Sequence, residues 1–503
     1  MRATADACLL VLPLLIALIL TGCATEALEL APEAADKPWK MTAARGEPAS
    51  TTGGPDDFSV PSNPALARIA NPVAIDTGAR YNLAQLIDIA QRSNPTTRNA
   101  WEQARQAALS VGMVEATMLP VITANVIGGV QETTVPVEVP LLGRRDIDTR
   151  VEGVTPSIAL QWLVFDFGQR AALADAAEQV SFAANVTFNA AHQKVIFDVT
   201  RSYYVYSASV VANRIAQETL RNSEAVAAAA QANFDEGRAT TVETALARQQ
   251  VAQSELRIVR AQGQQQDAYQ VLLAAMGVNA MLKIKINGSL DGRLPASLDR
   301  MTQSVLDAAL SRRPDVIASF AALQASRAGV QAAEAEFLPK IFVAATLAST
   351  SDSFDVGNLP APGNQASGVG VLVGATVPLY DAGLRAAQLK KAQSAVGAAA
   401  ETLRQVQLDA ATEIMVASNA LRTALAANKA AGVLVQTSET AFDAALASYK
   451  NGLGTVTVVN ETNNALLDAR LAQTDARAAA RIAAANLAFL TGALTSSRSV
   501  LPP

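Results

Sequence analysis

The two halves of this chain carry the same landmarks at the same spacings. In each half two prolines lie 25 residues apart, and two glycines further on lie 69 residues apart. Another glycine follows 40 residues later in both halves. This agreement indicates a duplicated unit, and its period is far longer than that of a solenoid repeat. The matched positions are Pro95 and Pro314, Pro120 and Pro339, Gly168 and Gly383, Gly237 and Gly452, and Gly277 and Gly492.

The composition leaves open a membrane protein but not a helical one. Half of the 503 residues are hydrophobic and the mean hydropathy is +0.19. Past residue 22, however, no stretch of 18 or more apolar residues occurs, so we expect no transmembrane helix. The formal net charge is −5 and there is no basic run, which argues against nucleic acid as a partner.

The N-terminus has the form of a bacterial lipoprotein signal. Arg2 precedes an apolar segment at residues 9–20, and Leu20-Thr21-Gly22-Cys23 follows. The thiol of Cys23 is the group that acyl chains such as palmitate would modify. The alternative is an ordinary signal peptide with an incidental cysteine. We expect residues 1–22 to be the signal peptide and residues 23–78 to be a lipidated tether.

Each repeat predicts one very long helix and two shorter ones. No Gly or Pro occurs between Gln169 and Glu236, so a helix of about 68 residues, roughly 100 Å long, is expected there. Asp166 stands where an N-cap acceptor would be needed. Helices at about 96–118 and 241–276 add up to roughly 90 Å. Two shorter helices stacked end to end can therefore span about the same height as the long one.

Strand-like segments follow the second proline of each repeat. Ile158, Leu160 and Trp162 share one parity, while Ser157, Ala159 and Gln161 share the other. The same alternation occurs at 369–379, and the apolar parity falls on the same face in both repeats. We expect hairpins of about 120–130 with 152–165 and of about 340–349 with 368–379, joined by loops at 131–151 and 350–367. One apolar face and one small or polar face are typical of a lipid-facing barrel strand with an aqueous lumen. The alternative is a soluble ribbon packed on helices.

Four strands cannot close a barrel. In lipid, an isolated four-stranded sheet would leave unpaired backbone groups along two edges, which hydrocarbon does not permit. A dimer would supply 8 strands, a trimer 12 and a tetramer 16, all of them even numbers compatible with outer-membrane barrels.

At this point the chain resembles the TolC-like outer-membrane efflux and secretion channels, over about residues 80–493. The resemblance implies a mainly α fold with a membrane β-barrel, in which a homotrimer forms a 12-stranded barrel and a long α-helical periplasmic tunnel. It also implies a periplasmic membrane-fusion adaptor as a partner, an inner-membrane pump as an indirect one, and contact with outer-membrane lipid. The matching segments are Leu119-Pro120, Leu338-Pro339, Phe165-Asp166-Phe167-Gly168-Gln169-Arg170, Tyr380-Asp381-Ala382-Gly383-Leu384-Arg385, and the segments that begin at Phe234 and Tyr449.

The resemblance assigns three kinds of site. Asp166, Gly168, Asp381 and Gly383 would form the turns from barrel to helix. Gly237 and Gly452 would lie at the periplasmic tip that contacts the adaptor, although both could be plain helix C-caps.

The third site is the gate that holds the tip closed, for which Glu243, Tyr449 and Glu461 are the candidates. We expect Tyr449 to be the hydrogen-bond partner of Glu243. The chain departs from the family at two gate positions, where Val458 replaces an acid and Gly454 replaces a base that some members carry. Ordinary solvated carboxylates at Glu243 and Glu461 are the alternative.

The functional prediction is an outer-membrane exit duct of a tripartite efflux system, lipid-anchored and extending into the periplasm. A type I protein-secretion channel is one alternative, and a lipid-tethered helical protein without a pore is another. We expect that the protein is not an enzyme and has no cofactor or metal site. His192 is the only histidine, and no nucleophile–base pair can be assembled. The predicted boundaries are 79–277 and 302–493 for the two repeats, 278–301 for a linker in the equatorial region and 494–503 for the tail.

Overall fold

The computed structural model describes residues 31, 34–37, 58, 64–67, 74–139, 143–292, 294, 301–356 and 363–494. The chain divides into two units, Met1–Ala70 and Asn71–Pro503. In the first unit the described part contains one short 3-10 helix, η2 (Pro64–Ala67). The second unit contains both repeats. None of its described helices is long and apolar enough to cross a membrane.

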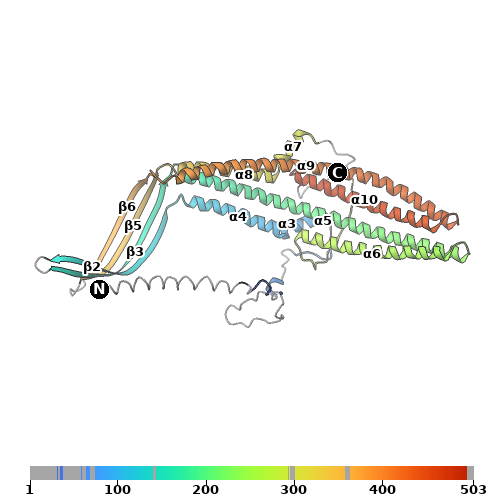
Figure 1. The fold of residues 1–503 in the computed structure, drawn as a ribbon, viewed down its shortest axis with the longest axis horizontal. Coiled ribbons are helices and arrows are strands. Elements are labelled where there is room, and N and C mark those ends of the chain that lie inside the picture. The colour runs from blue at the N-terminus through green and yellow to red at the C-terminus, as the bar shows by residue number, and fades with distance from the viewer. Residues whose placement is uncertain are drawn as a thin grey trace. The chain divides into compact units, whose positions relative to one another are not determined.

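The two repeats have the same order of elements (Figure 1). The first contains two shorter helices, two strands, a long helix and a returning helix, and the second repeats this order. This architecture confirms the predicted mainly helical fold built from a duplicated unit. The first repeat comprises α3 (Leu83–Ser93), α4 (Pro95–Ala116), β2 (Val121–Val139), β3 (Gly143–Phe165), α5 (Gln169–Asp235) and α6 (Thr241–Met276). The second comprises α7 (Gln303–Leu310), α8 (Pro314–Ala335), β5 (Lys340–Val356), β6 (Gly363–Thr376), α9 (Leu384–Lys450) and α10 (Val456–Leu490).

The four long strands form one antiparallel sheet in the order β2-β3-β5-β6. Its register places Ile158 beside Leu347, and Leu347 beside Val369, so the apolar residues of both hairpins share one face. This confirms the predicted common parity. Strands β2 and β6 are the edges of the sheet. A separate small sheet pairs β1 (Arg80–Tyr81) with β4 (Lys285–Ile286) in parallel.

The strands run further than the sequence predicted. Pairing of β2 with β3 continues to Val139 and Gly143, through most of the expected loop at 131–151. Pairing of β5 with β6 continues to Ser353 and Gly363, into the expected loop at 350–367. The added part of β2 is rich in the β-branched residues Val and Thr, which favour extended backbone even among charges.

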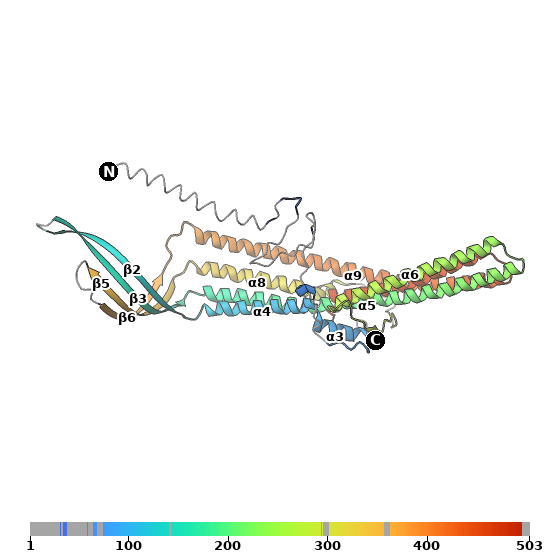
Figure 2. The same ribbon diagram turned by 90° about the horizontal axis from the view of Figure 1, so that it is seen from below.

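The helices form a row in which the long helix of each repeat lies beside the shorter ones. Next to the sheet, α5 packs between α4 and α8, and α8 packs on α9 (Figure 2). At the end of the long helices that is far from the sheet, α5 packs between α6 and α10, and α10 packs on α9. Helices α5 and α9 have 67 residues each, which corresponds to about 100 Å.

The shorter helices stack end to end, as predicted. At the end of α6, the side chain of Asn94 donates to the carbonyl of Ala275 at 2.9 Å, and Ser93 donates to that of Met276 at 2.9 Å. Gly277 has a φ of 70°, and a Cβ placed there would lie 2.7 Å from the Cα of Asn94. At the end of α10, a Cβ on Gly492 would lie 2.9 Å from the carbonyl oxygen of Arg312. In both repeats a glycine therefore permits two helix ends to meet.

Replacing Gly277 by Ala should destabilise the protein by about 1–3 kcal/mol, because alanine at a positive φ is strained and its Cβ would meet backbone. Gly329 is the matched control, since it lies inside α8 with nothing within 4 Å of an added Cβ. Gly329→Ala should be neutral or stabilising, because alanine favours helix over glycine. Thermal unfolding of both variants checks this, and an unchanged midpoint for Gly277→Ala would contradict it.

Candidate functional site

The turn from β3 into α5 is built around Asp166. Its carboxylate accepts hydrogen bonds from the backbone N–H of Gly168 at 3.3 Å and of Arg170 at 3.1 Å. The Arg170 guanidinium donates to the same carboxylate at 2.7 Å, and also to the carbonyl of Thr117 at 2.7 Å. Burial raises the pKa of Asp166, but its hydrogen bonds and the Arg170 charge outweigh burial and lower it overall. One ion pair thus ties the end of the strand, the start of the long helix and the end of α4.

The turn from β6 into α9 repeats this geometry around Asp381. The carboxylate accepts from the N–H of Gly383 at 3.1 Å and of Arg385 at 3.0 Å, and from the Arg385 side chain at 2.6 Å. The hydrogen bond from the Arg385 side chain is the main cause that lowers the pKa of Asp381 from 3.8 to about 2. The residues after the two aspartates, Phe167 and Ala382, have positive φ of 53° and 55°.

The N-cap of α5 was predicted at Asp166 but lies two residues later, at Gly168. The N-cap residues are Gly168 and Gly383, with φ of 90° and 89°, and neither offers a side-chain cap. The aspartates reach past these glycines to the first helical N–H groups. The motif Asp-x-Gly-x-Arg therefore works as one capping unit.

The far ends of the long helices close in two matching turns. Gly237 and Gly452 have φ of 71° and 73°, and each follows the last turn of its long helix. The N–H of Arg238 donates to the carbonyl of Asn233 at 2.7 Å, and that of Leu453 donates to Ser448 at 2.9 Å. These bonds satisfy carbonyls that a helix end leaves free. The α5/α6 turn and the α9/α10 turn lie at the same end of the helical row (Figure 1).

Tyr449 lies inside the core at this end, whereas the two candidate acids lie nearer its surface. Only 2% of Tyr449 is exposed, and it packs among residues such as Val226, Phe442 and Val459. Burial, and after it the negative charge of Glu243, raise the pKa of Tyr449, so its hydroxyl is neutral at pH 7. That hydroxyl has no hydrogen-bond partner among the described residues, so no bond joins it to Glu243 in a single chain. Glu461 is exposed on α10.

Two features of this end were missed from the sequence. Arg238 of the first turn, which pairs with Glu236, lies 3.7 Å from where a Cβ on Gly452 would stand. The second feature is a buried polar network between α5, α6 and α10. Ser223 shares a hydrogen bond with Ser254 at 2.9 Å and accepts one from Asn463 at 3.2 Å. Their pairing depends on tertiary packing, which no local pattern of serines and amides signals.

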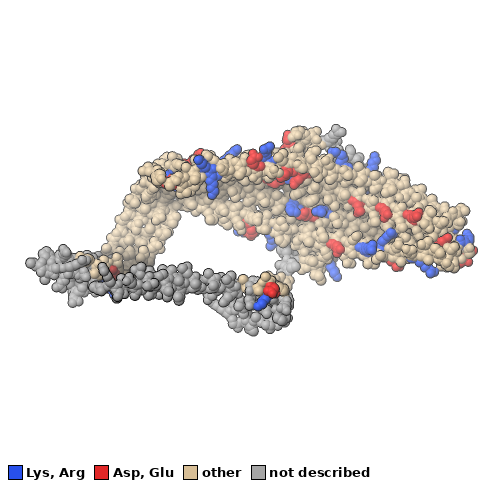
Figure 3. Space-filling model, in the orientation of Figure 1, with Lys and Arg blue, Asp and Glu red and all other residues tan. Residues whose placement is uncertain are grey.

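The sheet and the helices differ sharply in charge. The strands contain no Asp, Glu, Lys or Arg over residues 121–130, 153–165, 341–349 and 365–376. Figure 3 shows charged side chains spread over the helices, while the visible part of the sheet next to the helices has none. Trp162 extends from the apolar face of the sheet and donates to the carbonyl of Met118 at 2.8 Å. This uncharged part of the sheet, with its one apolar face, suits lipid.

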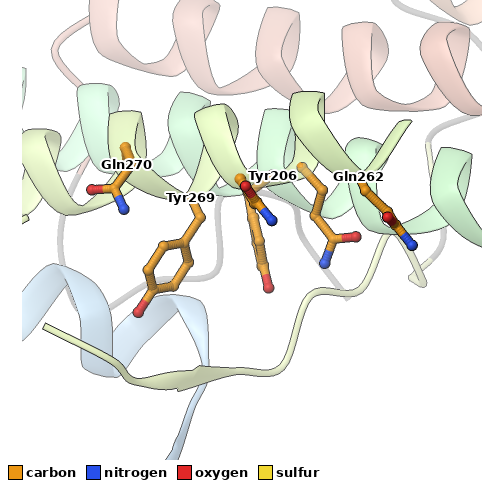
Figure 4. A pocket seen from close by; sticks show the side chains of 6 residues that line it. Tyr206, Gln262, Tyr269 and Gln270 are labelled. Atoms are coloured by element: carbon orange, nitrogen blue, oxygen red, sulfur yellow. The ribbon is translucent and has the colours of Figure 1, made fainter. Parts of the chain in front are cut away.

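A pocket of about 400 Å³ lies between α5 and α6 (Figure 4). Its lining is uncharged and comprises Tyr206, Tyr269 and four glutamines of α6. The hydroxyl of Tyr269 donates to the carbonyl of Leu282 at 3.0 Å and accepts from the N–H of Ile284 at 2.8 Å. Tyr203 donates to the carbonyl of Asn287 at 2.6 Å. These tyrosines hold the linker, and the described residues contain no group of three or more metal-ligating side chains.

A duplicated unit that joins a sheet, uncharged next to the helices, to a row of helices up to about 100 Å long defines the class of outer-membrane channel proteins. A family model described as outer membrane efflux protein matches residues 86–278 and 305–493. The chain therefore belongs to the outer membrane efflux protein family, which confirms the predicted class, outer-membrane location and efflux function.

Three individual comparisons agree. Outer membrane protein OprJ of Pseudomonas aeruginosa is 25% identical over 380 residues, which are 74% of this chain and 75% of OprJ. The probable outer membrane lipoprotein SilC of Salmonella typhimurium is 24% identical over 346 residues, 67% of this chain and 70% of SilC. The crystal structure of the Campylobacter jejuni CmeC outer membrane channel has a TM-score of 0.68 at 17% identity, over 83% of this chain and 87% of that one.

Acid should weaken the β6–α9 turn only at low pH. Because the pKa of Asp381 is lowered to about 2, its stabilising effect is complete above its ordinary pKa of 3.8 and is lost as the pH falls through about 2. Asp381→Asn should therefore lower the unfolding midpoint at pH 5 but have little effect at pH 2. Asp175→Asn, at an exposed site on α5, is the control and should show no such pH dependence. If the unfolding midpoint of Asp381→Asn differed from that of the parent protein by the same amount at pH 5 and at pH 2, the account would be contradicted.

Proposed function

We propose that the chain works as a homotrimeric, passive exit duct whose subunits join head to tail. One observation carries this proposal: the two edges of the sheet continue into the two edges of the helical row. Edge strand β2 follows directly from edge helix α4, and edge strand β6 leads into edge helix α9. A heterologous contact between unlike edges gives a closed ring when the rotation between subunits closes, as in cyclic symmetry.

The helical edges expose apolar side chains that a neighbouring subunit would cover. Leu109 and Met113 of α4 are 66% and 71% exposed. On α6, Leu256 and Val259 are 50% and 64% exposed. Exposed apolar patches of this kind mark interaction sites. The opposite edge, α9, exposes Leu408, Met415, Val416, Val433 and Leu434.

The strand count allows three copies, the number that the resemblance to TolC-like channels implies. Edges β2 and β6 each pair with one other strand in the described chain, and three sheets joined edge to edge give 12 strands. The apolar face, with Ile158 and Leu160, would then meet lipid. The opposite face, with Ser157 and Gln161, would line an aqueous lumen, and a conduit of this kind needs no catalysis or cofactor.

The remaining assignments complete the proposal. Gly237 and Gly452 would form the tip that contacts a periplasmic adaptor, which would link the duct to an inner-membrane pump. Glu243, Tyr449 and Glu461 would control the tip. A duct for type I protein secretion is the second candidate, because the same geometry serves both. Boundaries of 79–277 and 302–493 for the repeats are supported by the matched element order.

Lipidation would fix the N-terminus to the outer membrane. Cys23 lies outside the described residues, so the proposal depends on the lipoprotein signal and on the likeness to a lipoprotein such as SilC. Mass spectrometry of the mature N-terminus should find acylated Cys23, and Cys23→Ser should lose the acyl chains. An unmodified mature N-terminus at another residue would contradict lipidation and leave the channel proposal intact.

Charges placed on the apolar edges should prevent assembly. Met113→Glu on α4 and Val416→Glu on α9 should each reduce the trimer fraction, because a carboxylate would be buried without a partner. Ala322→Glu is the control, since Ala322 is exposed on α8 inside the row. Native mass spectrometry in detergent measures the outcome, and bilayer recordings should show ion conduction by the trimer. A conducting monomer would overturn the proposal.

A further inference from the structure

Arg313, the N-cap residue of α8, holds two carboxylates with one buried guanidinium group. Its Nε donates to Asp315 at 3.0 Å, and its Nη2 donates to Asp315 at 2.6 Å and to Glu413 of α9 at 2.8 Å. The side chain is only 9% exposed. The third nitrogen, Nη1, is buried and has no hydrogen-bond partner among the described residues. Because a buried N–H without an acceptor costs free energy, an acceptor is expected beside it.

A matching acceptor borders a small cavity beside Arg313. Gln193 of α5 has a buried side-chain oxygen, Oε1, which also has no hydrogen-bond partner within the described part of the chain. Gln193 and Arg313 both line a cavity of about 140 Å³. One buried donor and one buried acceptor therefore meet the same space without bonding each other. The rest of the lining is Asp315, whose carboxylate is already bonded to Arg313, and the apolar side chains of Ala190, Pro314, Phe489 and Leu490.

The matching junction of the first repeat is built differently. There Asn94 stands at the position of Arg313, and it donates directly to the carbonyl of Ala275 at 2.9 Å. The counterpart of Gln193 in the second long helix is Leu408, whose side chain has no polar atom. The duplicated fold therefore requires neither the arginine nor the glutamine, yet both occur at the junction where α10 meets α8.

We propose that this cavity binds an ordered water molecule that accepts a hydrogen bond from Arg313 Nη1 and donates one to Gln193 Oε1. Water can do both at once, and buried water in proteins bonds to polar groups that would otherwise lack a partner. The cavity is roomy enough, since one water needs about 10–15 Å³.

The charges around the cavity disfavour an ion in place of water. An anion would approach a guanidinium that already pairs with Asp315 and Glu413, and it would face the oxygen of Gln193. A cation would face the guanidinium itself. A neutral molecule that both accepts and donates is the chemistry that the lining fits.

This water would connect three helices at the second junction. Arg313 already links the start of α8 to Glu413 of α9, and the water would extend the link to Gln193 of α5. Phe489 and Leu490, the last residues of α10, form an apolar wall, so the water would be held at the polar side of the cavity. The first junction is joined by a side chain directly, whereas the second would be joined through solvent.

Cryo-electron microscopy of the full-length protein, at a resolution that shows ordered water, tests the site. Density should lie about 2.7–3.2 Å from both Arg313 Nη1 and Gln193 Oε1. The first junction is the internal comparison, where no water should stand between Asn94 and Ala275. A dry cavity, an ion in the cavity, or a direct hydrogen bond between Arg313 and Gln193 would overturn the proposal.

Gln193→Leu removes the acceptor and installs the residue that the second long helix has at the matched position. The water density should be lost and the unfolding midpoint should fall, because Arg313 Nη1 would remain buried without a partner. Gln264→Leu, at an exposed glutamine of α6, is the control and should keep both the water and the parental midpoint. Unchanged water density in Gln193→Leu would contradict the bridge. If that variant does not assemble, the structure of the parent protein decides the question.

Discussion

The need to satisfy backbone hydrogen bonds in lipid is the constraint on which the rest of this structure depends. A four-stranded sheet with an apolar face and two unpaired edges is not stable alone in hydrocarbon, since each free N–H and C=O group costs several kcal/mol, about the net stability of many domains. In the proposed trimer, each edge strand is joined to an edge helix, so the sheet and the helices of one subunit would meet the next subunit along the same edge. Oligomerisation would then be part of the fold.

The duplicated unit repeats the same junctions in both halves of the chain. Two Asp-x-Gly-x-Arg turns, at Asp166 and Asp381, join each hairpin to its long helix with nearly identical hydrogen bonds. Two glycines, Gly277 and Gly492, let the shorter helices abut and match the length of the long ones. The landmarks that occur twice in the sequence are therefore the places where the backbone changes direction or where helix ends meet.

Much of the fold could be predicted because it depends on local rules. The absence of Gly and Pro from Gln169 to Glu236 predicted the long helix, and alternation at 157–164 predicted the face of the strand that is apolar. Strand ends were less accurate, since charged residues in 131–151 hid a β-branched pattern. The N-cap of α5 was predicted at Asp166 but lies at Gly168, because a positive φ at Phe167 is not visible in the sequence.

The candidate site was harder to predict because its contacts join distant parts of the chain. The sequence located Gly237, Gly452 and Tyr449 at the turns, but their partners come from other helices. Asn463 meets Ser223 across 240 residues, and nothing local marks either one. The gate assignments of Glu243 and Glu461 stay predictions, since in one chain neither residue faces its symmetry-related copies.

Cryo-electron microscopy of the detergent-solubilised protein would test the central claim most directly. The account predicts a three-fold ring in which β2 of each subunit pairs with β6 of the next, and α4 and α6 of one subunit pack on α9 of its neighbour. Pairing of like edges, β2 with β2 or β6 with β6, would contradict it, as would a sheet that stays open at both edges.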